Sequence, residues 1–118
     1  MPSPTQTLGA AQERLAERAL VRLGYVVVER NWRGAGGEID RICWDREVLV
    51  FVEIRARTGH RHGHPAETVR YRKQRLLSRA AAAYLQSFPG ALPPARFDVV
   101  AVVGDDIEIY DDAFEVAL

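Results

Sequence analysis

Residues 37–57, GEIDRICWDREVLVFVEIRAR, decide the fold of this chain. Two runs of β-branched and aromatic residues flank a polar turn, and this pattern predicts a β-hairpin. If the loop is Asp45-Arg46, Asp40 pairs opposite Phe51 and Glu53 lies diagonally across from Asp40. Acids are rare inside apolar strands unless another group offsets their charge. The hairpin is therefore where we look first for a functional site.

Side chains alternate between the two faces of a strand, so the acids and a neighbouring cation fall on one face. Asp40, Glu53 and Arg55 share that face, with Glu38 beside them. The opposite face is predicted to pack against a helix and carries, interrupted by Arg41, the residues Ile39, Cys43, Val48, Val50, Val52 and Ile54.

Two carboxylates on one face repel each other unless a proton, an arginine or a metal ion offsets them. Oxygen ligands beside a cation suit Mg²⁺ or Mn²⁺, which can polarise a phosphoryl oxygen and lower the pKa of a bound water. Arg55 could then stabilise charge that develops on a phosphate. The alternative is a structural hairpin in which Arg55 pairs with Glu53 or Asp40, and the spacing alone leaves both interpretations open.

Length and composition predict one cytoplasmic domain. The chain has 118 residues, for which we expect a single domain over residues 6–116 and a flexible tail over residues 1–5. It has one cysteine, which fits a reducing compartment, and we expect no membrane span and no signal peptide.

The distribution of charge is uneven although the formal net charge is zero. Residues 98–118 hold seven acids and no Lys or Arg, so residues 1–97 carry sixteen basic and nine acidic side chains, a formal charge of +7. This basic region is compatible with a nucleic-acid partner, and equally with a solubilising surface.

Apolar periodicity predicts helices over residues 7–23 and 66–87, and strands over residues 25–31, 96–103 and 107–110. A glycine-rich loop is expected over residues 31–37, and a turn over residues 104–106. Helices mixed with a largely buried sheet indicate an α/β or α+β fold.

Several basic residues outside the hairpin are candidates for contact with phosphate. Lys73 falls on the inward stripe of the second helix, near its start, and Arg70 lies on another side of that helix. Arg57 and Arg61 border a polar loop that also holds His60, His62 and His64, which we interpret as a solvated loop rather than a metal site. Glu13 borders the apolar stripe of the first helix and is either a solvated acid or one that points toward the site.

Taken together, these residues resemble the YraN family of small bacterial proteins, which are similar to Holliday-junction resolvases and to nucleases of the PD-(D/E)XK class. The resemblance runs from Glu13 to Phe114. The residues that carry it are Glu13, Gly24-Tyr25, Arg30-Asn31-Trp32-Arg33, Gly37-Glu38-Ile39-Asp40, the run FVEIRAR at residues 51–57, Lys73-Gln74 and Arg96-Phe97-Asp98-Val99-Val100.

The resemblance implies a restriction-endonuclease-like αβββαβ core, with a mixed central sheet flanked by two helices. It implies that Asp40 and Glu53, with the carbonyl of Ile54, bind Mg²⁺ or Mn²⁺, and that Glu13 and Arg55 complete the catalytic set. The usual lysine of the motif is replaced by Arg55, which cannot act as a base. A homodimer is expected from the resemblance only.

Three functions remain open at this point. The first is a metal-dependent endonuclease-like enzyme that hydrolyses phosphodiester bonds in structured or branched DNA. The alternative is a nucleic-acid-binding module with a degenerate, inactive site. A third is a protein-interaction subunit whose acidic C-terminal stretch contacts a basic partner.

Overall fold

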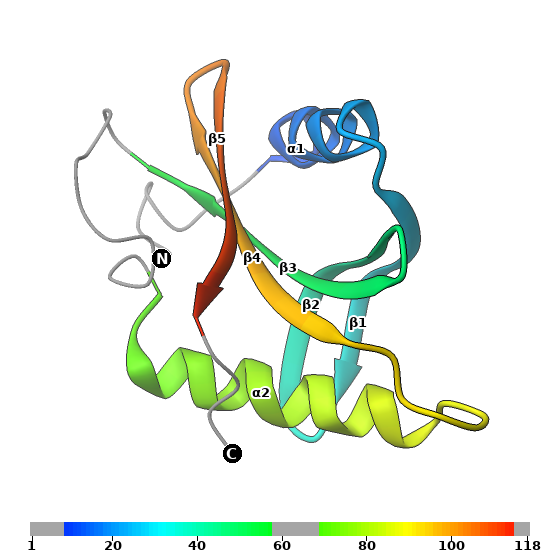
Figure 1. Cartoon of the computed structure of the whole chain (residues 1–118). Helices are drawn as coiled ribbons and strands as arrows, with labels where there is room; N and C mark the ends of the chain where they lie inside the picture. Colours follow the sequence, from blue (N-terminus) through cyan, green and yellow to red (C-terminus); the bar gives the residue numbers. More distant parts are fainter. Residues whose placement is uncertain (1–8, 58–68, 115–118) are drawn as a thin grey trace.

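The computed structural model describes residues 9–57 and 69–114, which form two helices and five strands (Figure 1). In chain order the elements are α1 (Ala10–Arg22), β1 (Val26–Gly34), β2 (Gly37–Asp45), β3 (Val48–Ala56), α2 (Tyr71–Gln86), β4 (Ala95–Val103) and β5 (Asp106–Phe114). None of the helices in these residues is long and apolar enough to cross a lipid bilayer.

The five strands form one mixed sheet in the order β1-β2-β3-β4-β5. β1, β2 and β3 pair antiparallel, β3 and β4 pair parallel through the α2 crossover, and β5 adds antiparallel to β4. Figure 1 shows α1 on one face of the sheet and α2 on the other. The predicted αβββαβ core with a helix on each face is confirmed.

Each face of the sheet has its own apolar cluster. Under α2 the cluster contains Ile42, Leu49, Phe51, Leu77 and Phe97, and under α1 it contains Ala16, Leu20, Val50, Val52 and Val100. Successive side chains of a strand point to opposite faces of the sheet, so the residues of β3 belong alternately to one cluster and to the other. A strand covered on both faces reads as a continuous apolar run, which explains the sequence VLVFV.

The predicted register of the β2–β3 hairpin was wrong by two residues. Asp45 pairs with Val48, so the loop is Arg46-Glu47 rather than Asp45-Arg46. Arg46 has a φ of 56°, a left-handed conformation that a two-residue hairpin loop can require. A shift of two residues leaves the paired residues 41–45 and 48–52 on their predicted faces, whereas a shift of one would have exchanged the faces.

One residue lies on the face opposite to the one predicted. Ile39 was expected beside Cys43 and Val50, but it belongs to the cluster under α2, together with Ile42. Ile39 and Ile42 are three residues apart, so strict alternation breaks between them. The break coincides with Asn31 of the neighbouring strand, which has a φ of 52°.

The glycine-rich segment is mostly strand rather than loop. β1 continues to Gly34 and β2 begins at Gly37, so only Ala35-Gly36 form the turn. Both turn residues have positive φ, 53° and 79°, as the tight turn of a hairpin requires.

The other boundaries differ in smaller ways. α2 begins at Tyr71, because Arg70 before it has extended backbone, and residues 66–68 of the predicted helix lie outside the described part of the chain. β5 runs over nine residues instead of the predicted four, up to Phe114, whose ring stacks on Phe97 at 4.7 Å.

A buried polar cluster joins four segments at the α1 face. Asp98 is fully buried and accepts hydrogen bonds from the Tyr25 hydroxyl at 2.7 Å, from Arg96 Nε at 2.9 Å and from the Asp112 amide at 2.9 Å. Arg96 Nη2 also donates to Asp45 at 2.9 Å. Because a buried charge is tolerated only when paired and hydrogen-bonded, this cluster ties β1, the β2–β3 hairpin and β5 to β4.

Gly37 lies directly against α2, with no room for a side chain. A Cβ placed there would lie 2.7 Å from the main-chain oxygen of Leu76 and 3.3 Å from the Ala80 Cβ. We expect Gly37→Ala to lower the free energy of unfolding by about 1–3 kcal/mol, the usual cost of overpacking, as measured by urea denaturation.

Gly9→Ala is the matched control. There the added methyl group would meet only the movable end of Gln12. Because Gly9 is the exposed N-cap of α1, where Ala is less favourable than Gly, we expect a loss of at most about 1 kcal/mol, smaller than that of Gly37→Ala. Equal stability of Gly37→Ala and wild type would show that the helix can shift away from the sheet.

Candidate functional site

The candidate site lies where β2 and β3 separate. The ladder of paired residues ends at Arg41 and Val52. Beyond this point the Ile54 amide donates to Asp40 Oδ2 at 2.8 Å, so a side chain takes the place of a main-chain partner. Extending the register by one residue sets Asp40 beside Glu53, closer than the diagonal arrangement that was predicted.

Glu53 is a buried carboxylate that shares a hydrogen bond with Asp40. Only 6% of the residue is exposed, and its neighbours on the same face, Leu49 and Phe51, belong to the core under α2. Burial raises the pKa of Glu53 to about 8, and the charge and hydrogen bond of Asp40 add to that increase. Lys73 and Arg55 lower the pKa without cancelling the effect. Burial and the neighbouring Asp40 therefore disfavour the charged form of Glu53 near neutral pH.

Two cations converge on the same oxygen of Glu53. Lys73 Nζ lies 3.5 Å and Arg55 Nη1 lies 3.9 Å from Glu53 Oε2. Lys73 comes from the first turn of α2 and Arg55 from β3, two residues after Glu53. Their side chains are 47% and 29% exposed, so both cations lie between the buried carboxylate and the solvent.

The donor atoms fit a hydrated oxygen-seeking ion. Asp40, Glu53 and the main chain at Ile54 offer carboxylate and carbonyl oxygens, which Mg²⁺ and Mn²⁺ prefer. Within residues 9–57 and 69–114 no group of three or more His, Cys, Asp and Glu side chains comes together. Such a small set suits an ion that keeps several of its waters, and not a closed zinc site.

Glu13 reaches the site only through an arginine. Its Oε1 lies 3.5 Å from Arg41 Nη1, and the same nitrogen donates to the main-chain oxygen of Asp40 at 2.7 Å. Glu13 is therefore a half-buried acid that pairs with a buried cation next to Asp40. The catalytic role that the resemblance implies for Glu13 remains a prediction.

The other predicted contact residues are dispersed. Arg57 is 8% exposed and its Nη1 lies 3.4 Å from Glu108 and 3.2 Å from the Tyr110 hydroxyl, so β5 engages it. Arg70 is exposed immediately before α2. Arg61, His60, His62 and His64 lie outside the described residues.

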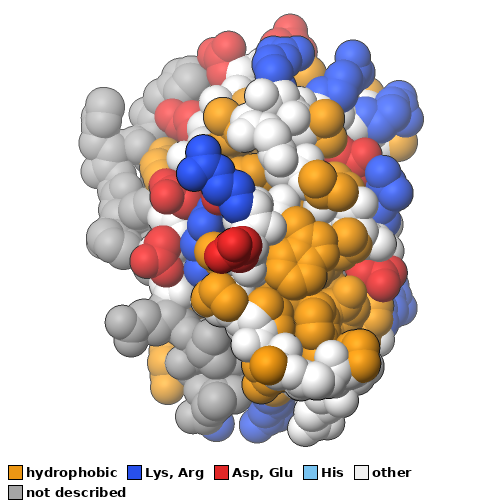
Figure 2. Space-filling model, turned by 45° about the vertical axis from the view of Figure 1, so that its right-hand side comes forward, with side chains coloured by type: hydrophobic (Ala, Val, Ile, Leu, Met, Phe, Trp, Pro, Cys, Tyr) orange, Lys and Arg blue, Asp and Glu red, His pale blue; other side chains and the backbone are white. Residues whose placement is uncertain are grey.

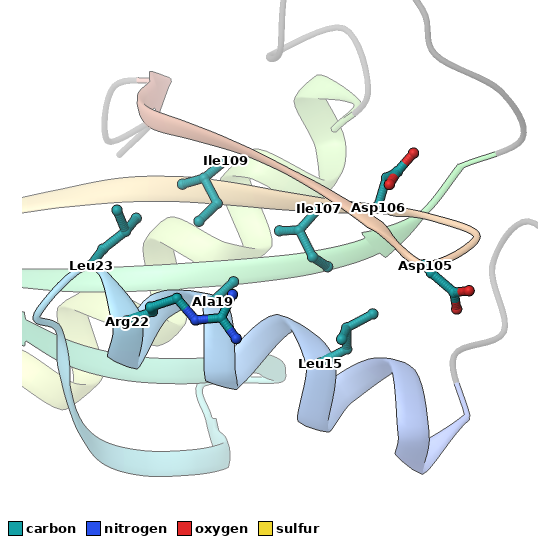
Figure 3. Close-up of a pocket in the computed structure, with 8 residues that line it drawn as sticks. All are labelled: Leu15, Ala19, Arg22, Leu23, Asp105, Asp106, Ile107 and Ile109. Carbon is teal, nitrogen blue, oxygen red and sulfur yellow. The ribbon is translucent and has the colours of Figure 1, made fainter.

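A separate groove of about 380 Å³ lies between α1 and the β4–β5 turn (Figure 3). Its walls combine apolar side chains of both elements with Arg22, Asp105 and Asp106 at the rim. The groove is on the α1 face, whereas Glu53 and Lys73 are on the α2 face. It is therefore not part of the two-carboxylate site.

The sequence analysis missed the polar groups on the α1 face. Arg41 was treated as an interruption of an apolar strand face, and Glu17 and Tyr25 were given no part in a polar cluster. The one available signal was Arg41 itself, because an arginine inside a covered strand must have partners. Its acidic partner could not be chosen from the sequence, since Glu13 and Glu17 are one helical turn apart.

Fold and site together define an α/β protein with two adjacent carboxylates at the divergence of two strands, faced by one lysine and one arginine. The model described as "Uncharacterised protein family UPF0102" matches residues 12–102. The chain belongs to this family, which is the YraN family of the resemblance.

Relatives in this family match along most of their length. A UPF0102 protein of Chlorobaculum tepidum is 45% identical over 103 residues, which cover 87% of this chain and 80% of the relative. One from Symbiobacterium thermophilum is 46% identical over 98 residues, 83% of each chain. One from Desulfosudis oleivorans is 42% identical over 120 residues, covering 100% of this chain and 98% of the relative. The names of these relatives give the family and no activity, so the function has to be inferred from the site.

The proton held by Glu53 predicts a pH-dependent stability. Its pKa is raised above the usual 4.5, so the stability it contributes is full below about pH 4.5 and is lost as the pH rises toward about 8. The loss can reach about 1.4 kcal/mol per pH unit. The glutamine of Glu53→Gln cannot titrate. As the pH rises across this range, the free energy of unfolding should therefore fall for wild type and not for the variant.

Urea denaturation in the presence of a chelator, at several pH values, measures this difference. Glu47→Gln, which alters an exposed acid in the β2–β3 loop, is the control and should follow wild type. Parallel pH profiles for wild type and Glu53→Gln would contradict the prediction.

Proposed function

We propose that this chain is a Mg²⁺- or Mn²⁺-dependent endonuclease-like hydrolase that cleaves phosphodiester bonds in nucleic acid, with structured or branched DNA as its substrate. The observation that carries the proposal is the convergence of four charged groups. Asp40 and Glu53 share a hydrogen bond, and Lys73 and Arg55 both approach Glu53 Oε2. Sites that bring oxygen ligands and cations together in this way suit phosphoryl chemistry.

Asp40, Glu53 and the carbonyl of Ile54 are the residues that would hold the ion. When bound, such an ion polarises a phosphoryl oxygen and lowers the pKa of a bound water. The Ile54 amide keeps Asp40 oriented, and burial keeps competing water away from Glu53. Replacing the shared proton by a divalent cation would satisfy both carboxylates at once.

Arg55 and Lys73 are assigned to the phosphate. A guanidinium stays protonated at all relevant pH values, so Arg55 holds charge and does not accept a proton. Both side chains are partly exposed, so a ligand can contact them without a change in the structure. Once an ion neutralises Glu53, both cations are released from their ion pairs and can bind phosphate oxygens.

The start of α2 gives independent support for a polyanionic partner. Its first turn contains no acidic residue, and the exposed basic residues of this region are Arg70, Arg72, Lys73, Arg75 and Arg79. Cations at a helix N-terminus oppose the helix dipole and cost about 0.3–1 kcal/mol each. A phosphate backbone along this helix would offset that cost and also attract the substrate.

Figure 2 shows one face of the molecule, on which hydrophobic side chains form an apolar area with both acidic and basic side chains around it. Because the border carries charges of both signs, this face does not by itself favour a polyanionic partner. The support for nucleic-acid binding therefore comes from the basic residues at the start of α2.

A second candidate function is a nucleic-acid-binding module with an inactive site. The observation that favours it is the burial of Glu53, which raises its pKa and disfavours the charged form, together with Arg55 in the position of the usual lysine. Such a module binds nucleic acid in a salt-sensitive way and shows no metal-dependent turnover.

Asp40→Asn tests the proposed function directly. The amide oxygen can still accept the Ile54 N–H, but the charge that would hold the ion is lost. We expect loss of saturable Mn²⁺ binding in calorimetry and a fall of about 10²-fold or more in cleavage of a branched DNA.

Asp105→Asn, in the exposed β4–β5 turn, is the matched control and should behave as wild type. Cleavage that survives in Asp40→Asn would remove this site from the reaction. Salt-sensitive DNA binding without cleavage by wild type would favour the binding module.

Arg55→Ala/Lys73→Ala tests where the phosphate backbone binds. Each phosphate contact contributes about 0.9 to the slope of log affinity against log salt on duplex DNA, so the slope should fall by about 2. Fluorescence anisotropy over a salt series measures it. The control, Arg14→Ala/Arg18→Ala, removes two exposed cations of α1 on the other face. An equal loss in both variants would mean that binding is not centred on the site.

A further inference from the structure

Arg41 is a buried cation that the proposed reaction does not use. The residue is 5% exposed and sits in β2 on the α1 face. Its Nε donates to Glu17 Oε1 at 2.7 Å, and its Nη1 donates to the main-chain oxygen of Asp40 at 2.7 Å. Burying an arginine is costly unless its partners are well placed, so these contacts need a reason beyond filling space.

Glu17 holds the guanidinium in place. It accepts two hydrogen bonds from Arg30, at 2.8 Å each, as well as the one from Arg41. The hydrogen bond from Arg30 is the largest cause that lowers the pKa of Glu17, so this acid stays charged near neutral pH. A charged acid between two guanidinium groups anchors Arg41 to α1 on one side and to β1 on the other.

Asp40 needs support because it stands at a gap in both ladders. The β2–β3 pairs end at Arg41, and the β1–β2 pairs pass from Arg41 to Ile39. Among the described strand pairs none includes Asp40. Its main-chain oxygen instead receives the Arg41 Nη1–H, while its carboxylate receives the Ile54 N–H.

We infer that Arg41, held by Glu17, is a positioning residue that fixes the main chain at Asp40 so that the carboxylate meets Ile54 and Glu53. The two hydrogen bonds act at opposite ends of one residue, so together they set both the position and the direction of its side chain. The contact from Nε to an acid and from Nη1 to a carbonyl needs a planar fork, which an ammonium group lacks. The consequence for metal binding rests on the proposed function, whereas the orientation of Asp40 does not.

The test variant is Arg41→Leu/Glu17→Leu. Replacing a buried ion pair by apolar residues of similar size is often neutral, so the fold should persist, although the exposed Arg30 loses its partner Glu17. The Asp40 carbonyl, however, loses its donor. We expect faster hydrogen exchange of the Ile54 amide in the metal-free protein, measured by NMR, and a Kd for Mn²⁺ that rises about 10–100-fold.

The matched control is Arg33→Ala, which breaks an exposed Arg–Glu pair, 3.0 Å apart, between β1 and β2 and keeps every carboxylate of the hairpin. It should leave the Ile54 exchange rate and the Mn²⁺ affinity as in wild type. Arg41→Lys, which keeps the charge and loses the fork, should also speed exchange, and it provides the test if the double variant does not fold.

Unchanged exchange at Ile54 in folded Arg41→Leu/Glu17→Leu or Arg41→Lys would overturn the inference, and Arg41 would be only an anchor of α1. Absence of Mn²⁺ binding by wild type together with faster exchange in the variant would retain the positioning role and reject the metal site. The two failures are therefore separable.

Discussion

Glu53 is a carboxylate that the fold buries between an apolar strand and α2, and the arrangement around it is the main constraint on this structure. A buried acid must be protonated, paired or bound to a metal, and here all the neighbouring groups act toward that end. Asp40 shares a hydrogen bond with it, and Lys73 and Arg55 approach its Oε2 atom. The docking of α2 and the separation of β2 from β3 are thus coupled to one ionisable group.

The α1 layer supports this group from the other face of the sheet. Glu17 and Arg41 connect α1 to the main chain of Asp40, and Asp98 with Arg96 and Tyr25 closes the far end of the same layer. Charged groups in pairs with directed hydrogen bonds give a unique arrangement where an apolar contact would allow sliding. The site consequently lies on strands that are fixed from both sides, as precise placement of charged ligands requires.

The fold class and the faces of the hairpin were predictable, and the register was not. Alternation of side chains puts Asp40, Glu53 and Arg55 on one face whichever loop joins the strands, provided that the error is an even number of residues. The loop is Arg46-Glu47 and not Asp45-Arg46, and it contains Arg46 in a left-handed backbone conformation. The amino-acid sequence does not predict that conformation for an arginine. Ile39 was misplaced for a related reason, because the positive φ of Asn31 interrupts the alternation locally.

From the sequence alone one can determine which residues must find partners, since an acid or an arginine inside a covered strand cannot stay unpaired. This reasoning singled out Asp40, Glu53 and Arg55, whereas Lys73 was chosen from its place on the inward stripe of the second helix. The family membership of the chain agrees with the resemblance that these residues carry. Only the tertiary structure decided which partner each one takes. Helical spacing alone would let Arg41 pair with either Glu13 or Glu17, and in the folded chain Glu17 is the closer partner, at 2.7 Å against 3.5 Å. Hydrogen bonds depend on distances of a few tenths of an ångström, and those distances are set by the packing of layers that are remote in the chain.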